Sequence, residues 1–186
     1  MKKKIITVVL VLNSLFAKSQ LDKKTWMIGG SISYSKAKYN TGVFNSMQEQ
    51  YEYSISPKIG YFFFDKICGG IITSFDEVGS KAQGSIVWSK YSNFNFGPFL
   101  RYYFLKKEKM INILAECNYQ LGAEGSTNGL NKNTLSFAAG PVLYFNSSVG
   151  LEFLITHNTY RYKNVNASDN KIQLSIGLQI HLQKDK

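Results

Sequence analysis

Apolar and polar residues alternate along much of this chain, and the alternation is purest near its C-terminal end. Between residues 172 and 182 every second residue is Ile or Leu, and the residues between them are Gln, Ser, Gly and His. A period of two is that of a β-strand with one apolar and one polar face, because successive side chains point to opposite sides. The pattern predicts a strand from Ile172 to Leu182.

Seven more segments alternate in the same way, which makes eight strands of about ten to thirteen residues in all. They begin near Trp26, Tyr51, Ile67, Ser92, Met110, Thr134 and Val149. Short turns are expected at 65–66, 106–109 and 146–148, and long polar loops at Tyr39–Gln50, Val78–Tyr91, Ala123–Asn133 and Arg161–Asn170. Short turns at one end and long loops at the other predict an all-β, eight-stranded antiparallel up-and-down transmembrane β-barrel. Both termini should lie at the short-turn end.

Alternation alone also fits a secreted, lipocalin-like barrel that binds an apolar ligand, so the exposed face must be identified from other residues. Of the sixteen lysines in residues 20–186, only Lys58 lies well inside a strand, and the polar face is mostly Ser, Gly, Asn and Gln. A water-facing strand would carry charges along its length, whereas small polar residues suit a narrow lumen. Aromatic residues gather towards strand ends, as membrane girdles require: Trp26, Tyr51, Tyr53, Tyr61, Phe63, Phe64, Tyr102, Phe104, Phe145 and Tyr160. These observations favour an apolar face towards lipid.

Three prolines fall on the outward face within the predicted strands, at Pro57, Pro98 and Pro141. Proline donates no hydrogen bond to a ladder, and a local β-bulge would accommodate each of them. The two cysteines, Cys68 and Cys117, are assigned to opposite faces of non-adjacent strands. We therefore predict no disulfide.

The N-terminus has the features of a secretory signal. Lys2, Lys3 and Lys4 precede an apolar run, and small residues flank Lys18. We predict a signal peptide over residues 1–19 and a barrel domain over residues 20–186. Its removal leaves 18 basic and 12 acidic residues, so the net charge falls from +10 to +6.

Composition excludes several functional classes. A mean hydropathy of −0.17 argues against a bundle of membrane-spanning helices, although 44% of the residues are apolar and 15% aromatic. The only arginines are Arg101 and Arg161, and no basic stripe is interleaved with stacking aromatics, so nucleic acid is not expected as a partner. Lysines at the membrane edges are expected to meet lipid phosphates.

Four charged residues are predicted to share the inward face at similar depth: Lys58, Arg101, Glu116 and Glu152. Pairing across the 106–109 turn would place Arg101 opposite Glu116. Two cations and two carboxylates would neutralise one another in a site with little water. We interpret this lumen charge network as a structural plug, with an ion-selective constriction as the functional alternative.

Support for catalysis is thin. His157 near the outer rim, with Ser168 and Asp169 in the following loop, is the one arrangement that would suit a lipid-modifying enzyme. No nucleophile-elbow, zinc-protease, phosphate-loop or dinucleotide motif is present. We expect no enzyme, and no catalytic, cofactor-binding or metal site. The aromatic loops Tyr39–Gln50 and Val78–Tyr91 could contact other surfaces.

The segments Ser56–Phe63, Gly97–Phe104 and Ala139–Val142 also resemble a known family. The chain is similar, over the whole of residues 20–186, to small outer-membrane β-barrel proteins of the OmpA/OmpX type, in the porin-like branch common in Bacteroidota. The resemblance implies a monomer in the outer membrane of a Gram-negative bacterium, inserted by the outer-membrane assembly machinery and surrounded by outer-membrane lipids and lipopolysaccharide. The expected role is envelope structure or surface contact, with little or no pore activity.

Overall fold

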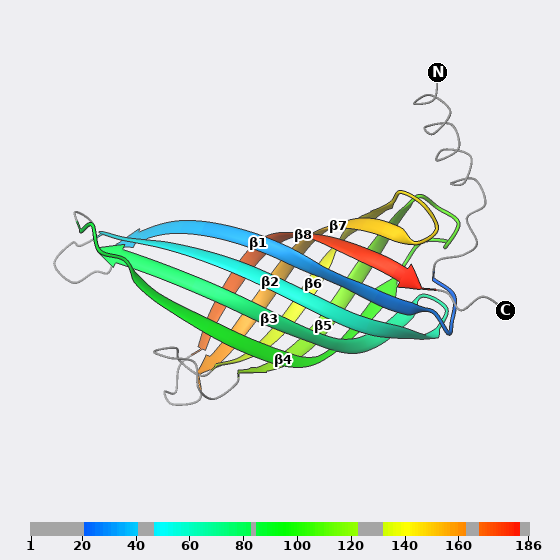
Figure 1. Cartoon of the computed structure of the whole chain (residues 1–186), viewed down its shortest axis with the longest axis horizontal. Coiled ribbons are helices and arrows are strands. Elements are labelled where there is room, and N and C mark those ends of the chain that lie inside the picture. The colour runs from blue at the N-terminus through cyan, green and yellow to red at the C-terminus, as the bar shows by residue number, and fades with distance from the viewer. Residues whose placement is uncertain (1–20, 41–46, 83–84, 123–131, 163–167, 183–186) are drawn as a thin grey trace, which may run out of the picture.

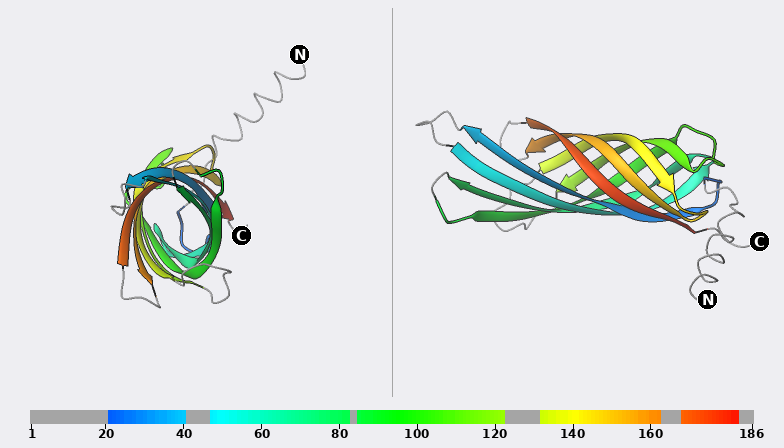
Figure 2. Two further views of the ribbon diagram at one scale, coloured as in Figure 1. Left: turned by 90° about the vertical axis from the view of Figure 1, so that its left-hand side faces the viewer. Right: turned by 90° about the horizontal axis from the view of Figure 1, so that it is seen from above.

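Eight antiparallel strands close into one barrel, each paired with its neighbour in the chain and β8 paired with β1 (Figures 1 and 2). The computed structural model describes residues 21–40, 47–82, 85–122, 132–162 and 168–182, so the predicted signal peptide lies outside the described residues. The strands are β1 (Trp26–Asn40), β2 (Met47–Phe64), β3 (Ile67–Ala82), β4 (Ser89–Tyr103), β5 (Ile111–Gly122), β6 (Lys132–Tyr144), β7 (Val149–Tyr162) and β8 (Ser168–Leu182). The predicted up-and-down barrel is confirmed.

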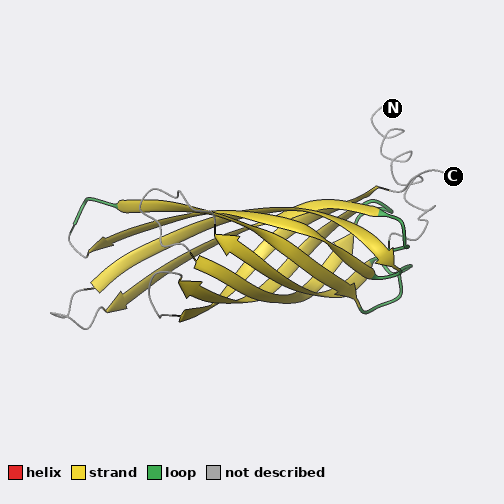
Figure 3. Cartoon of the chain, turned by 90° about the horizontal axis from the view of Figure 1, so that it is seen from below, coloured by secondary structure: helices red, strands yellow, loops and turns green. Residues whose placement is uncertain are grey.

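The short turns after β2, β4 and β6 lie at the same end of the barrel as the start of β1 and the end of β8 (Figure 3). This is the arrangement that an even number of up-and-down strands requires. The described residues include no helix long and apolar enough to span a membrane.

The strands are longer than the alternation predicted. β2 has 18 residues and β3 has 16, and only β5 and β6, with 12 and 13, fall within the expected length. The predicted loops are correspondingly shorter, because backbone pairing continues beyond the point where apolar residues alternate. At the loop end, β1, β2 and β3 project further than β5 and β6 (Figures 1 and 2). A ladder needs only backbone hydrogen bonds, so it does not require an apolar face.

The outer face is apolar and the lumen is polar. Ile, Leu and Phe side chains that alternate along the strands are exposed on the outside, whereas Asn95, Asn118 and Gln120 are buried inside. This is the reverse of a soluble barrel with an apolar ligand cavity. Cys68 faces the lumen and Cys117 the outside, and both are free thiols, as predicted.

Most of the predicted girdle residues face outwards at the strand ends. Trp26, Phe64, Tyr102 and Phe104 are exposed near the short turns. Tyr160 is an exception: its register partner is the buried Thr134, and the Nζ of Lys132 lies 4.2 Å from its ring centroid inside the barrel. The prediction for Tyr160 was wrong because the register of β7 turns its even-numbered residues inwards.

The three prolines are accommodated without the bulges that the sequence left open. The register of β2 with β3 is unchanged on either side of Pro57, as is that of β4 with β5 around Pro98. Each proline instead lies in a short gap of the ladder with the following strand, and Pro141 does the same between β6 and β7. A missing donor therefore costs local pairs and leaves the register intact.

β1 pairs with β8 over a shorter stretch of backbone than with β2. β1 pairs with β2 along its whole length but with β8 only as far as Ile32 and Ile176. Above that point side chains bridge the two strands from inside: Gln173 donates to Ser33, and the Lys171 Nζ donates to the Ser35 Oγ at 3.0 Å. Polar lumen residues thus continue the closure where backbone pairing ends.

The short-turn end is closed by the residues that precede β1. Leu21 is fully buried, and its carbonyl accepts a hydrogen bond of 2.8 Å from the Lys66 N–H. Leu21 joins an apolar floor with Met27, Phe62, Cys68, Tyr103, Leu114 and Tyr144. The first described residues are therefore part of the barrel.

Leu21→Ala is expected to destabilise the folded barrel by about 2–3 kcal/mol, because it leaves a cavity in this floor. Urea unfolding of the protein in lipid vesicles measures the loss. Asp22→Ala is the matched control, since the pair of Asp22 with Lys107 is partly exposed and such pairs contribute at most about 1 kcal/mol. An equal loss in both variants would contradict the buried role of Leu21.

Candidate functional site in the barrel lumen

The four charged residues singled out in the sequence all point into the lumen. Lys58 lies on β2, Arg101 on β4, Glu116 on β5 and Glu152 on β7, and each is between 0 and 6% exposed. The register places Arg101 directly opposite Glu116. Antiparallel partners point to the same side of a sheet, so this register brings the two side chains together inside the barrel.

Arg101 is the centre of the group. Its Nε and Nη2 donate to the Glu116 Oε2 at 2.9 and 2.7 Å, and its Nη1 donates to the Glu152 Oε1 at 2.6 Å. The Nη2 also reaches the Glu152 Oε2 at 3.1 Å. The guanidinium therefore crosses the lumen from β4 and joins carboxylates on β5 and β7. Arg suits this position because its planar fork offers several donors at once.

Lys58 completes the charge balance from the other side of Glu116. Its Nζ donates to both Glu116 oxygens, at 3.0 and 2.9 Å. The four side chains carry two positive and two negative charges, so the group is neutral as a whole. A neutral, hydrogen-bonded group can be buried where a single unpaired charge could not.

Three uncharged residues that sequence reasoning did not single out extend the network. Gln179 accepts from Arg101 Nη1 at 2.8 Å and from the Tyr103 hydroxyl at 2.6 Å, and its Nε2 donates to the Tyr144 hydroxyl at 2.9 Å. Alternation had already assigned Gln179 to the polar face, but nothing in its residue type indicated a role. We call Lys58, Arg101, Glu116, Glu152, Tyr103, Tyr144 and Gln179 the lumen plug.

A second charged layer lies closer to the loop end. Lys171 donates to the Glu52 Oε2 at 2.6 Å, and Lys132 Nζ lies 4.0 Å from Asp76 Oδ2. The sequence had placed both lysines at strand ends or in loops, because β6 and β8 extend further than alternation predicted. The two lysines could have been assigned to the lumen only by extending the predicted strands and continuing the alternation of inward and outward residues.

Between the two layers the lumen holds a polar cavity of about 70 Å³. Lys58 and Glu116 line one end, Glu52 and Asp76 the other, and serines from several strands form much of the wall. This space has room for a few water molecules. The lumen is thus open to polar contents above the plug, while the plug and the apolar floor fill it below.

The three residues considered for catalysis do not lie together in the structure. His157 pairs with Ile172 and points outwards, whereas Ser168 lies four residues further along the ladder, about 13 Å away. Asp169 accepts a hydrogen bond of 2.9 Å from the Tyr162 hydroxyl. Among the described residues, no three His, Cys, Asp or Glu side chains are grouped so as to hold a metal ion.

Comparisons with known proteins agree with this architecture. No family model matches the chain, and no curated protein matches it in sequence. The crystal structure of Neisserial surface protein A superimposes with a TM-score of 0.53 at 12% identity, covering 84% of this chain and 96% of that one. A de novo designed transmembrane β-barrel gives a TM-score of 0.44 at 9% identity, covering 87% and 98%. The chain therefore has the fold of a small, eight-stranded transmembrane β-barrel.

Proposed function

We propose that this protein is a non-enzymatic barrel of the outer membrane, serving envelope structure or surface contact, with little or no pore activity. The proposal includes a signal peptide over residues 1–19, insertion by the outer-membrane assembly machinery, and a monomer surrounded by outer-membrane lipids and lipopolysaccharide. It also includes membership of the OmpA/OmpX type, in the branch common in Bacteroidota. The likeness to Neisserial surface protein A supports the outer membrane as the location.

The observation that carries the proposed lack of pore activity is the position of Arg101. Its guanidinium is fully buried and bonded to Glu116 and Glu152, which stand on different strands. An ion moving along the lumen would have to displace this side chain and then pass the apolar floor around Leu21 and Phe62. Ion-selective constrictions need weak, exchangeable contacts with the ion, whereas these donors are already occupied.

Surface contact is favoured by the tip between β3 and β4. Ile86 and Val87 are 93% and 70% exposed, and Trp88 packs on Tyr51 with ring centroids 5.0 Å apart. Exposed apolar side chains on a rigid support commonly mark interaction sites. The tip lies at the end of the barrel opposite the short turns (Figure 1).

Cell fractionation should recover the protein with outer membranes, and unheated samples should migrate differently from boiled ones on a denaturing gel. Purified protein in a planar bilayer should show no stable conductance steps. Recovery as a soluble periplasmic protein would overturn the membrane location, and regular conductance steps would overturn the closed lumen. Altered lipid A acylation on deletion of the gene would instead reveal an enzyme.

A further inference from the structure

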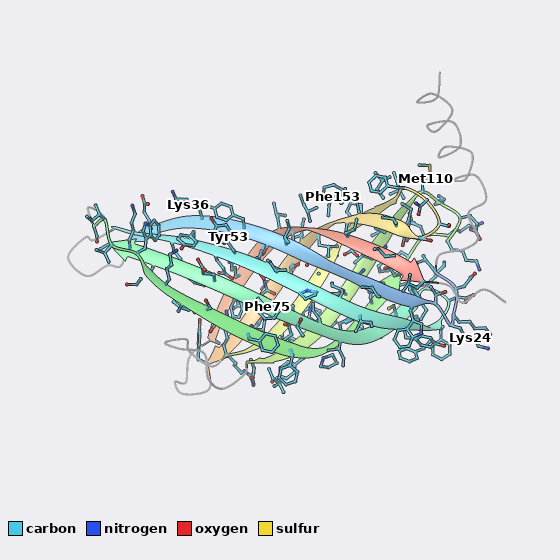
Figure 4. All side chains as sticks on the ribbon, viewed as in Figure 1. Lys24, Lys36, Tyr53, Phe75, Met110 and Phe153 are labelled. Atoms are coloured by element: carbon cyan, nitrogen blue, oxygen red, sulfur yellow. The ribbon has the colours of Figure 1, made fainter. Side chains whose placement is uncertain are left out.

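The outer surface of the barrel carries a long groove of about 1720 Å³, distinct from the polar cavity inside. Two rows of outward side chains form its walls, running across the strands from β7 through β8, β1 and β2 to β3 and β4. Tyr53, Phe75 and Phe153 mark its course in Figure 4.

The strand register sets out the two rows. The lower row passes through Phe153, Ile176 and Ile32 and continues to Ile55, Phe75 and Phe94, each paired with the next. The upper row begins with Ile155 and Leu174, continues through Tyr34 and Tyr53, and ends at Glu77 and Ser92. Close aromatic pairs strengthen the walls: Tyr34 with Tyr53 at 5.0 Å, and Phe75 with Phe94 at 4.8 Å between ring centroids.

The groove climbs along the barrel axis as it crosses the strands. Its lower end includes Pro141, three residues from the end of β6 at Tyr144, whereas Ser92 lies eleven residues from the end of β4 at Tyr103. At about 3.3 Å per residue and a tilt of about 40°, this difference of eight residues is a rise of about 20 Å. The apolar band of such a barrel is about 25 Å tall, so the groove runs from within the band to its loop-side edge.

The chemistry of the groove changes along this path. Around Phe153, Ile155 and Leu174 the outward side chains that line the groove are apolar, and Leu174 is 70% exposed. At the β3–β4 end it is lined by Glu77 and Lys90, with the Lys90 Nζ 3.8 Å from the Glu77 Oε1. An apolar channel that ends in a few charged groups is the usual form of a site for an amphipathic ligand.

The charged end carries both signs. The Lys90 and Glu77 side chains are 60% and 46% exposed, so their mutual attraction is weak and both remain accessible to a ligand. A ligand with a phosphate alone would be attracted by Lys90 and repelled by Glu77. A phosphate next to an ammonium would satisfy both.

We infer that this groove binds one zwitterionic phospholipid, with an acyl chain lying between the two rows and a phosphoethanolamine head group at Lys90 and Glu77. The phosphate faces the Lys90 ammonium and the lipid ammonium faces the Glu77 carboxylate. The inference rests on the proposed membrane location and adds to it a defined lipid site.

The test uses the full chain, purified and folded in detergent, and incubated with equal amounts of phosphatidylethanolamine and phosphatidylglycerol that carry the same acyl chains. Native mass spectrometry should find one retained lipid per protein, with phosphatidylethanolamine preferred about threefold, the effect of one exposed charge pair. The double variant Lys90→Ala/Glu77→Ala should still retain one lipid but should no longer prefer phosphatidylethanolamine. The control Lys109→Ala, at the other end of the barrel, should change neither retention nor preference.

Leu174→Trp should fill the apolar half of the groove and lose the bound lipid. Leu100→Trp is its matched control, because Leu100 is also an exposed outward residue, at 57%, but does not line the groove. Ile155→Trp provides a second filling variant. Gel migration with and without heating establishes separately that each variant has folded as a barrel. Three results in folded protein would overturn the inference. They are that the wild-type chain retains no lipid, that both filling variants retain as much lipid as the wild type, or that the wild type retains phosphatidylglycerol and phosphatidylethanolamine equally.

Discussion

Arg101→Met is expected to destabilise the barrel by about 3–5 kcal/mol, the usual cost of removing one partner from a buried ion pair. Glu116 would keep only Lys58, at 2.9 Å, and Glu152 would lose both of its hydrogen bonds from the guanidinium. Two carboxylates would then share a buried site with one cation. Urea unfolding in lipid vesicles, followed by the gel shift of unheated samples, measures the loss.

The control for this prediction removes every charge of the group together. A combined variant, Lys58→Met/Arg101→Met/Glu116→Gln/Glu152→Gln, leaves no unpaired charge, so it should recover most of the stability lost by Arg101→Met alone. If the combined variant were much less stable than the single one, the ion pairs would contribute more than their desolvation costs. If Arg101→Met had no effect, the lumen plug would not be structural.

Gly97→Ala/Gly140→Ala is expected to lower stability by about 6 kcal/mol, or to prevent folding, since each change alone should cost about 3 kcal/mol. A Cβ at Gly97 would lie 1.9 Å from the Tyr119 carbonyl oxygen, and one at Gly140 would lie 1.9 Å from the Phe153 carbonyl oxygen. Both obstacles are backbone atoms of a neighbouring strand, so the strands themselves would have to separate. The two sites share no partner, and their effects should add.

Gly69→Ala is the matched control for these substitutions. Its Cβ would lie 3.1 Å from a ring carbon of Phe63, an exposed side chain that can shift, and it should cost less than about 1 kcal/mol. Refolding yield into vesicles and urea midpoints measure all three changes. A Gly140→Ala protein as stable as Gly69→Ala would show that the β6–β7 spacing can relax.

These glycines show how far the sequence could be interpreted alone. Gly97 and Gly140 each precede a proline, and alternation placed them on the inward face. It could not show that a neighbouring carbonyl lies where a side chain would stand, because that depends on how two strands approach in space. For the same reason the sequence could not show how the prolines are accommodated, which is by a few missing pairs in the ladder beside them.

Strand number, strand direction and the assignment of faces were available from the sequence, because each follows from local periodicity and turn length. The same alternation placed four charged residues in the lumen: Lys58, Arg101, Glu116 and Glu152. The tertiary structure alone decided which charges meet and what else joins them. Gln179 is 78 residues from Arg101 in the chain, and the two become neighbours only when β8 pairs with β1 and the barrel closes. Alternation reports which side a residue faces, but the curvature and stagger of a closed sheet determine which residues stand at the same depth.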